Sequence, residues 1–447
     1  MTSELLQQVR VIDPVSGTDQ QSLDVLIVDG AIKAVQEQIS DYPADTQIKD
    51  CRGLVLGPGL VDLYSHSGEP GFEERETLAS LMASAAAGGF TRLNVLPDTM
   101  PPLDNPAGLA RLQSGRGAEE LAWGLNRRES RGAKENLQQF SPQHPSTTAP
   151  QLYFWGALTL GLQGQQMTQL AELAAAGVVG FADGRPLENL ALLRRILEYL
   201  KPLEKPIALW ACDRQLVGNG VMREGYYSVR FGLPGNPAIA ETTALSAILE
   251  LVATIRTPVH IMRVSTARSV ELIAKAKSEG LPVTASTTWM HLLLDTKVVK
   301  SYNTSLRLEP PLGTPSDLAA LRAGVRLGIV DAIAIDHTPH TYEEKVQAFA
   351  EALPGAIGLE LALPLLWQYL VESGEFTALE LWKALSNRPA ECLGQKMSAI
   401  APDKKAELTL FNPQESWKVN SENLYTLSSN TPWLGQQLTG RVIQTWC

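Results

Sequence analysis

Short apolar runs that alternate with helical segments constrain the fold of this chain more than any other feature. Eight strand-like runs occur in order, and many are followed by a stretch with helical spacing, such as Leu190–Leu200 and Ala240–Thr254. Eight alternations favour an α/β fold of the closed (β/α)8 TIM-type barrel over an open sheet. The runs are Leu54–Leu63, Thr91–Leu96, Leu152–Ala157, Gly177–Phe181, Ile207–Ala211, Val259–Val264, Val283–Ser286 and Ala332–Ile335.

Both ends of the chain have β character without this alternation. Residues 1–56 hold short β segments separated by turn signals such as Asp29-Gly30, and residues 396–447 return to β patterns at 406–411 and 441–446. We therefore expect three parts, with the barrel in residues 57–395 between the two β-rich ends.

The first strand–loop–helix–strand unit of the predicted barrel carries the densest set of polar residues. Its first strand ends in Tyr64-Ser65-His66, an acidic loop and an Ala-rich helix follow, and Gly88-Gly89 end that helix. The second strand ends at Pro97-Asp98-Thr99. In parallel α/β folds, the carboxyl ends of the strands carry the chemistry, so these clusters are candidates for a functional site.

This unit resembles the metal-binding segment of the dihydroorotases, within the cyclic amidohydrolases. Their pattern is a strand ending Asp-x-His-x-His, then Leu-Arg-Glu-Pro-Gly, and later Pro-Asn-Thr-x-Pro. The chain differs at Tyr64, where the family has its first metal-binding His, at Gly68, where it has a substrate-binding Arg, and at Asp98, where it has a substrate-binding Asn. The residues that match are Asp62, His66, Glu69-Pro70-Gly71, Pro97, Thr99, Pro101 and Asn105.

The resemblance extends through the whole chain and implies which later residues take the remaining family positions. Asp183 and Asp336 would be metal-ligand positions, with Asp336 also the catalytic base, and His340 would contact substrate. Trp210 and Met290 stand where two further metal-binding His would be, and His291, next to Met290, leaves open a one-residue shift that restores a ligand. The resemblance also implies that both chain ends form one small β domain beside the barrel.

Metal-dependent hydrolysis of a cyclic amide needs a cation that activates water and polarises the carbonyl. The residual ligand positions would be His66, Asp183 and Asp336, because a thioether and an indole are not zinc ligands and a neutral phenol is a poor one. We therefore expect no metal, or at most one residual zinc ion. Trp210 and Met290 would fill the space apolarly and close the pocket.

Two substrate-binding positions of the family pattern are also replaced by residues that do not favour binding of the family's substrates. An Arg binds a carboxylate through a bidentate pair, which Gly68 cannot supply, and Asp98 places an anion where an anionic substrate would bind. Arg185 or Arg263 could compensate if either reached the site.

The bulk composition excludes several other classes. The formal charge is −10 with no sustained basic block, which argues against nucleic acid as a partner. The beginning of the chain has no signal-peptide core, no run approaches the length of a membrane span, and four spaced cysteines are typical of reduced thiols. We expect a cytoplasmic protein, with a helix and an exposed loop over residues 112–148.

Three functional hypotheses follow. The first is a non-catalytic dihydroorotase-like protein of pyrimidine biosynthesis, because the resemblance implies that inactive homologues serve as structural partners of aspartate carbamoyltransferase; we also expect a homo-oligomer. The second is an active cyclic amidohydrolase with a reduced metal site, which would lose hydrolysis in Asp336→Ala. The third is a sealed barrel that senses a small ligand, which ligand-dependent thermal stabilisation would reveal.

Overall fold

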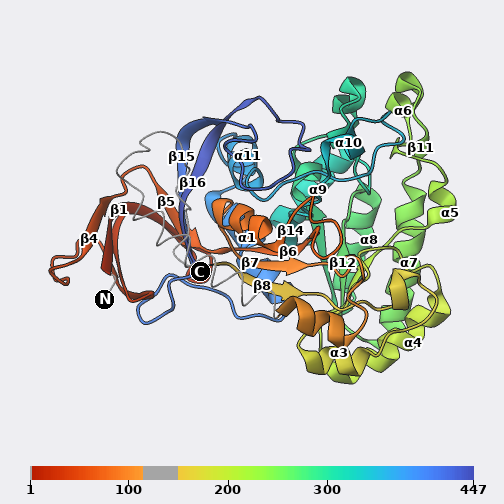
Figure 1. Ribbon diagram of the computed structural model, residues 1–447, viewed down its shortest axis with the longest axis horizontal. Coiled ribbons are helices and arrows are strands. Elements are labelled where there is room, and N and C mark those ends of the chain that lie inside the picture. The colour runs from red at the N-terminus through yellow and green to blue at the C-terminus, as the bar shows by residue number, and fades with distance from the viewer. Residues whose placement is uncertain (1–2, 114–148) are drawn as a thin grey trace.

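Parallel strands form a closed barrel at the centre of the protein. The computed structural model describes residues 3–113 and 149–447 (Figure 1). Seven strands and one short segment at 179–182, which is joined to its neighbours by single bridges, follow one another around the barrel in chain order. The strands are β6 (Leu60–Ser65), β7 (Phe90–Val95), β8 (Gln151–Phe154), β9 (Ala208–Trp210), β12 (Val259–Met262), β13 (Val283–Thr288) and β14 (Ala332–Ala334).

The barrel closes just after β14. The backbone N–H of Asp336 donates to the carbonyl oxygen of Tyr64 at 3.1 Å, and that of His66 donates to His337 at 2.8 Å. The eight predicted strand runs therefore lie where the barrel has its eight segments, and the predicted TIM-type barrel is confirmed.

Helices surround the barrel, and their caps agree with the local sequence. Helix α1 (Leu78–Ala87) begins with a capping box at Thr77 and ends at Gly88, followed by Gly89 with φ +86°. Helix α4 (Leu190–Leu200) turns its leucine and isoleucine face into the core. The other α-helices are α3 (Leu170–Ala176), α5 (Arg214–Val217), α6 (Tyr226–Phe231), α7 (Ile239–Ile255), α8 (Ala267–Ser278), α9 (Pro315–Leu327), α10 (Tyr342–Lys345), α11 (Ala362–Leu366), α12 (Ala378–Leu385) and α13 (Asn387–Cys392).

A separate sheet combines both ends of the chain and lies at the left of Figure 1. Its strand order brings the last two strands next to the first ones, and a second apolar cluster forms its own core. This confirms the small β domain that the resemblance implies. The order is β16 (Gln437–Trp446), β15 (Leu408–Lys418), β5 (Val55–Pro58), β1 (Ser3–Asp13), β2 (Thr18–Val28) and β3 (Ala31–Gln36), with β4 (Gln47–Asp50) paired to β1. A further short pair, β10 (Met222–Arg223) and β11 (Gly235–Asn236), lies in a loop.

One predicted strand is divided between the two sheets. The run 54–63 contains β5, which joins the terminal sheet, and β6, which opens the barrel. The division falls at Gly59, where a Cβ atom would lie 2.2 Å from the side chain of Thr91. The absence of a side chain lets the two sheets meet here. The part boundaries at residues 56 and 395 stay predictions.

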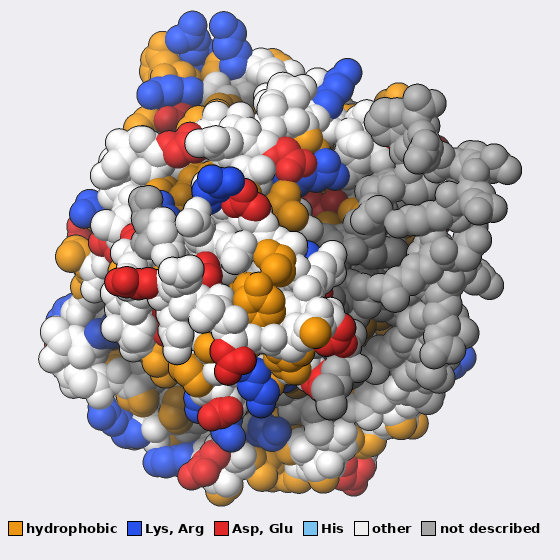
Figure 2. All heavy atoms as spheres, turned by 90° about the vertical axis from the view of Figure 1, so that its left-hand side faces the viewer, with side chains coloured by type: hydrophobic (Ala, Val, Ile, Leu, Met, Phe, Trp, Pro, Cys, Tyr) orange, Lys and Arg blue, Asp and Glu red, His pale blue; other side chains and the backbone are white. Residues whose placement is uncertain are grey.

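The remaining sequence expectations concern the surface and the thiols. None of the four cysteines, which all lie in the described residues, forms a disulfide. On the face that Figure 2 shows, basic and acidic side chains are interspersed among the residues that are described, without a large basic patch. Across 3–113 and 149–447, no helix is long and apolar enough to span a membrane. Most of the loop expected at 112–148 lies outside the described residues.

Candidate functional site

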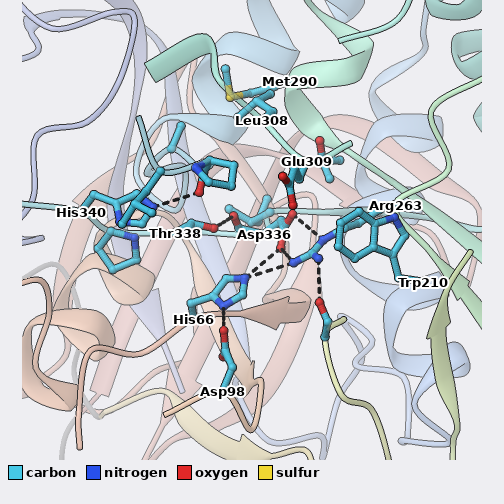
Figure 3. Close-up of a pocket in the computed structure, with 18 of the residues that line it drawn as sticks. His66, Asp98, Trp210, Arg263, Met290, Leu308, Glu309, Asp336, Thr338 and His340 are labelled. Atoms are coloured by element: carbon cyan, nitrogen blue, oxygen red, sulfur yellow. Dashed lines mark hydrogen bonds and ion pairs between the residues drawn. The ribbon is translucent and has the colours of Figure 1, made fainter. Parts of the chain in front are cut away.

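A cavity of about 390 Å³ lies at the carboxyl ends of the barrel strands. Most of the predicted site residues line it, including His66, Asp98, Trp210, Met290 and Asp336. Figure 3 shows His66, Asp98 and Asp336 near one another, whereas Met290 lies farther away. The pocket is not closed as expected, because the two large apolar side chains form part of its wall and leave its interior open.

The side chain of Arg263 lies at the centre of the candidate ligand cluster. It follows β12, and its guanidinium binds Asp336 through two hydrogen bonds, Nε–Oδ2 at 2.8 Å and Nη2–Oδ1 at 2.6 Å. A third bond runs from Nη1 to the carbonyl oxygen of Gly184 at 3.0 Å. The side chain of Arg263 is only 5% exposed, so this is a buried bidentate ion pair.

His66 joins this pair to Asp98. Its Nδ1 lies 2.7 Å from Oδ2 of Asp98, and its Nε2 lies 3.5 Å from Oδ1 of Asp336 and 3.1 Å from Nη2 of Arg263. Asp98, at the family position for substrate binding, is therefore already engaged by a protein side chain.

The electrostatics of the cluster balance internally. Burial lowers the pKa of His66, but Asp98 and Asp336 outweigh it and raise the pKa to about 9. Burial raises the pKa of Asp336, yet Arg263 and His66 together lower it well below its ordinary value. A guanidinium and an imidazole thus face two carboxylates.

Tyr64 and Trp210 both contact the Arg263 residue. The phenol oxygen of Tyr64 accepts the backbone N–H of Arg263 at 3.1 Å and lies 3.0 Å from Oγ of Ser286. The guanidinium carbon lies 4.8 Å from the centroid of the Trp210 ring, within range of a cation–π interaction. Two residues at positions where the resemblance implies metal ligands therefore contact one arginine.

Both members of the central ion pair have a left-handed backbone. The φ angle is +55° at Arg263 and +53° at Asp336. Non-glycine residues in this region are uncommon and cluster at functional sites. The barrel therefore holds these two side chains in place at some conformational cost.

Asp183 has a different role from the predicted ligand position. Its Oδ1 accepts the backbone N–H groups of Leu158 and Thr159 at 2.7 and 3.1 Å, and its Oδ2 accepts the Thr159 hydroxyl at 2.6 Å. Burial raises its pKa. Its two oxygens organise the loop after β8, and it contacts neither His66 nor Asp336.

Met290 and His291 lie on another part of the cavity wall. Figure 3 shows Met290 beside Leu308, away from the Arg263 cluster. His291 places Nδ1 2.7 Å from the Thr288 hydroxyl and Nε2 3.3 Å from the Pro311 carbonyl oxygen. Burial lowers its pKa to about 4, so it is neutral. The one-residue shift left open by the sequence does not bring His291 to the other candidate ligands.

The predicted substrate contacts are also occupied or blocked. The Nε2 of His340 lies 2.9 Å from the carbonyl oxygen of Pro354, and burial lowers the pKa of this imidazole to about 4. A Cβ atom at Gly68 would lie 2.2 Å from the Phe72 carbonyl oxygen and 2.4 Å from that of Glu76. The loop therefore has no room for the arginine of the family pattern unless its backbone moves.

A zinc centre does not fit this donor set. Two of the three residual ligand positions face a guanidinium, and the third binds backbone amides. Among residues 3–113 and 149–447, no group of three or more His, Cys, Asp or Glu side chains could hold a metal ion. A divalent cation would add charge to a cluster whose charges are already paired.

The central position of Arg263 in the site was not predicted from the sequence. This residue was expected only as a possible substitute for the substrate-binding Arg of the family. The signal was a charged residue near the end of the apolar run Val259–Val264, because residues at that end of each strand share one site. The other arginine considered, Arg185, lines the cavity and makes no hydrogen bond or ion pair with the described parts of the chain.

Comparisons with known proteins agree on the surrounding fold and family. No protein-family model matches the chain. It is 43% identical over 451 residues to a probable dihydroorotase-like protein of Synechocystis sp., covering 99% of each chain. It is 38% identical over 442 residues to a dihydroorotase of Pelobacter propionicus, covering 99% of this chain and 97% of the relative.

Solved structures with a similar fold are hydantoinases and dihydropyrimidinases. An L-hydantoinase (dihydropyrimidinase) from Arthrobacter aurescens superposes with a TM-score of 0.78 at 21% identity, covering 100% of this chain and 94% of the other. A dihydropyrimidinase from Brevibacillus agri superposes with a TM-score of 0.75 at 19% identity, covering 99% and 93%. At these identities the likeness supports the barrel with its added β domain.

Proposed function

Because the chain belongs to the dihydroorotase family of the amidohydrolase superfamily, we propose that it is a dihydroorotase-like protein of pyrimidine biosynthesis that does not hydrolyse dihydroorotate. The observation that carries this proposal is the guanidinium of Arg263, which binds both oxygens of Asp336 and lies beside His66. A catalytic base in this position must accept a proton from water. The ion pair opposes this, because it stabilises the unprotonated carboxylate and lowers its pKa.

The substrate side of the cavity supports the same proposal. The family position for carboxylate recognition is Gly68, where the loop backbone leaves no space for a side chain. Asp98 brings a negative charge to the cavity, and its pKa is lowered because His66 outweighs the effect of burial. Dihydroorotate and carbamoyl aspartate are both anions, and neither Gly68 nor Asp98, which is already bound to His66, offers them a cationic partner.

We propose further that the protein acts in the cytoplasm as a structural or regulatory partner of aspartate carbamoyltransferase, and that it forms a homo-oligomer. The partner role is the one that the family resemblance implies for inactive homologues. The test is copurification of the untagged chain with the transferase of the same organism, followed by light scattering of the complex.

The experiment that tests the catalytic part is a ring-opening and ring-closing assay on one sample, without added metal and with zinc, cobalt or manganese. We expect no turnover under any of these conditions. Turnover that elutes with the protein in chromatography and is lost in Asp336→Ala would reject the proposal. The matched control is Asp331→Ala, since this carboxylate lies outside the cavity and pairs with Lys277.

An active cyclic amidohydrolase with a reduced metal site is the second candidate. The open cavity of about 390 Å³ favours it, since a small cyclic amide has room there. The 38% identity to a protein described as a dihydroorotase also favours it. This candidate requires Arg263 to leave Asp336 when substrate binds, and it predicts metal-dependent hydrolysis of some cyclic amide.

A further inference from the structure

The candidate metal ligands already converge on a positive charge that belongs to the chain. His66 extends from the end of β6 and Asp336 follows β14, so the two side chains come from strands that meet where the barrel closes. The Nη2 atom of Arg263 lies 2.6 Å from Oδ1 of Asp336 and 3.1 Å from Nε2 of His66 (Figure 3). One guanidinium nitrogen thus contacts both of the residues that are candidate metal ligands.

The distance between these ligands fits a single tetrahedral metal ion. Two donors that each lie about 2.0–2.1 Å from one zinc ion, at a tetrahedral angle, are about 3.3 Å apart. Nε2 of His66 and Oδ1 of Asp336 are 3.5 Å apart. The side chains therefore keep a spacing suited to a metal ion, while the space between them is taken by the guanidinium.

We propose that the guanidinium of Arg263 replaces the metal ion of this barrel, as a permanent cation that holds the carboxyl ends of β6 and β14 together. This inference rests on the proposed function, because a chain that needs no metal for chemistry can use a fixed charge instead. A guanidinium keeps its charge at every physiological pH, and its planar fork matches a carboxylate.

The surroundings of Arg263 are arranged for a guanidinium. The Trp210 ring lies 4.8 Å from its central carbon, the Gly184 carbonyl oxygen accepts from Nη1, and the Tyr64 hydroxyl accepts the backbone N–H. A ring face and a carbonyl oxygen both stabilise a cation with several N–H donors. The residues that depart from the family pattern at positions 64 and 210 thus both contact Arg263 and help to hold it in place.

This proposal implies that a metal site is latent in the chain. Replacing the guanidinium by a shorter imidazole would free His66 and Asp336 and add a third donor at position 263. One carboxylate and two imidazoles are a common three-ligand set for zinc or cobalt, with water as the fourth ligand. Left-handed backbone angles are tolerated by histidine better than by most residues, so the substitution suits the backbone at this position.

The test compares metal content and Co²⁺ absorption of the wild type and Arg263→His, both purified without an affinity tag. We expect the wild type to hold less than about 0.1 equivalent and Arg263→His about one equivalent, with a visible Co²⁺ band. Arg263→Met and the matched buried control Arg92→His should hold no more than the wild type. Adding His66→Ala to Arg263→His should abolish binding.

Two results would overturn the proposal. One is an Arg263→His protein that unfolds cooperatively and binds no cobalt. The other is a wild type that holds about one equivalent of zinc and loses it in His66→Ala, a result that does not depend on whether any variant at 263 folds. Dihydroorotate turnover by the wild type would instead refute the proposed function, and the metal measurements above are independent of it.

Discussion

The first prediction concerns the stability that the Arg263 ion pair contributes. Arg263→Met keeps the length and apolar stem of the side chain but removes a guanidinium that makes two hydrogen bonds to Asp336 and one to Gly184. Asp336 is then left as a carboxylate whose side chain is 14% exposed. Breaking one partner of a buried pair costs about 3–5 kcal/mol, because the remaining charge stays desolvated.

His66 reduces this cost without removing it. Its imidazole, whose pKa is raised to about 9 by its two carboxylate neighbours, lies 3.5 Å from Asp336 and is not altered by the substitution. We therefore expect a loss at the lower end, about 3 kcal/mol, which corresponds to a fall of roughly 3 °C in Tm for a chain of this size.

The stability that the Arg263–Asp336 ion pair contributes depends on pH. In the wild type the folded pKa of Asp336 is depressed, so its stabilisation is present above the unfolded pKa of about 3.9 and is lost as pH falls through the lower folded pKa. Without Arg263, only His66 opposes the effect of burial, so this pKa is higher in the variant than in the wild type. The Tm difference between wild type and Arg263→Met should therefore be large at pH 7 and shrink as pH falls through the folded pKa of Asp336 in the variant.

The assay is thermal and urea unfolding of four proteins: wild type, Arg263→Met, Asp336→Asn and the double variant. The double variant should lose less than the sum of the single losses, since each single change leaves one partner unpaired. The matched control is Arg185→Met, a cavity arginine that is exposed and should change stability by at most about 0.5 kcal/mol. A Tm loss in Arg263→Met that is under about 1 °C, or independent of pH, would refute the reasoning.

Three further predictions test residues around the cavity and beside it. Burial raises the pKa of Glu360 to about 8, so stability should fall as pH rises from about 4.3 to 8, and Glu360→Gln should flatten that slope; equal slopes in the two proteins would contradict this. Asp183→Ala removes the acceptor for two backbone N–H groups and should cost about 2–4 kcal/mol in urea unfolding without changing metal content, whereas unaltered unfolding would argue against a structural role. Gly68→Ala places a Cβ 2.2 Å from the Phe72 carbonyl oxygen and should cost about 1–3 kcal/mol, and a Tm equal to that of wild type would show that the loop has room.

The barrel could be predicted from sequence because its signals are local. Most of the buried strands are short apolar runs, and several of the helices begin at a capping residue or end at a glycine, as α1 does at Thr77 and Gly88. The split of the run 54–63 into two strands could not be predicted in this way. It depends on the side chain of Thr91, which packs against Gly59 and lies 32 positions further along the chain.

The candidate site was less predictable because its contacts join distant strands. A family pattern gave the positions Tyr64, His66 and Asp336, and the structure brings these three together around Arg263. The same pattern gave Asp183, whose oxygens bind a neighbouring loop instead. A local pattern shows which strand end a residue occupies. It does not show which of several acceptors its side chain will satisfy.

The replaced residues also explain why metal binding and hydrolysis need not return together. A single imidazole at position 263 would complete a three-ligand site, because His66 and Asp336 already have the spacing of two zinc ligands. Hydrolysis would need more. The carboxylate of the substrate has no arginine at Gly68, where the backbone of 72 and 76 leaves no space, and Asp98 stays bound to His66. Metal-loaded Arg263→His should therefore bind cobalt without opening dihydroorotate, since a cation activates water only for a substrate that the site can hold.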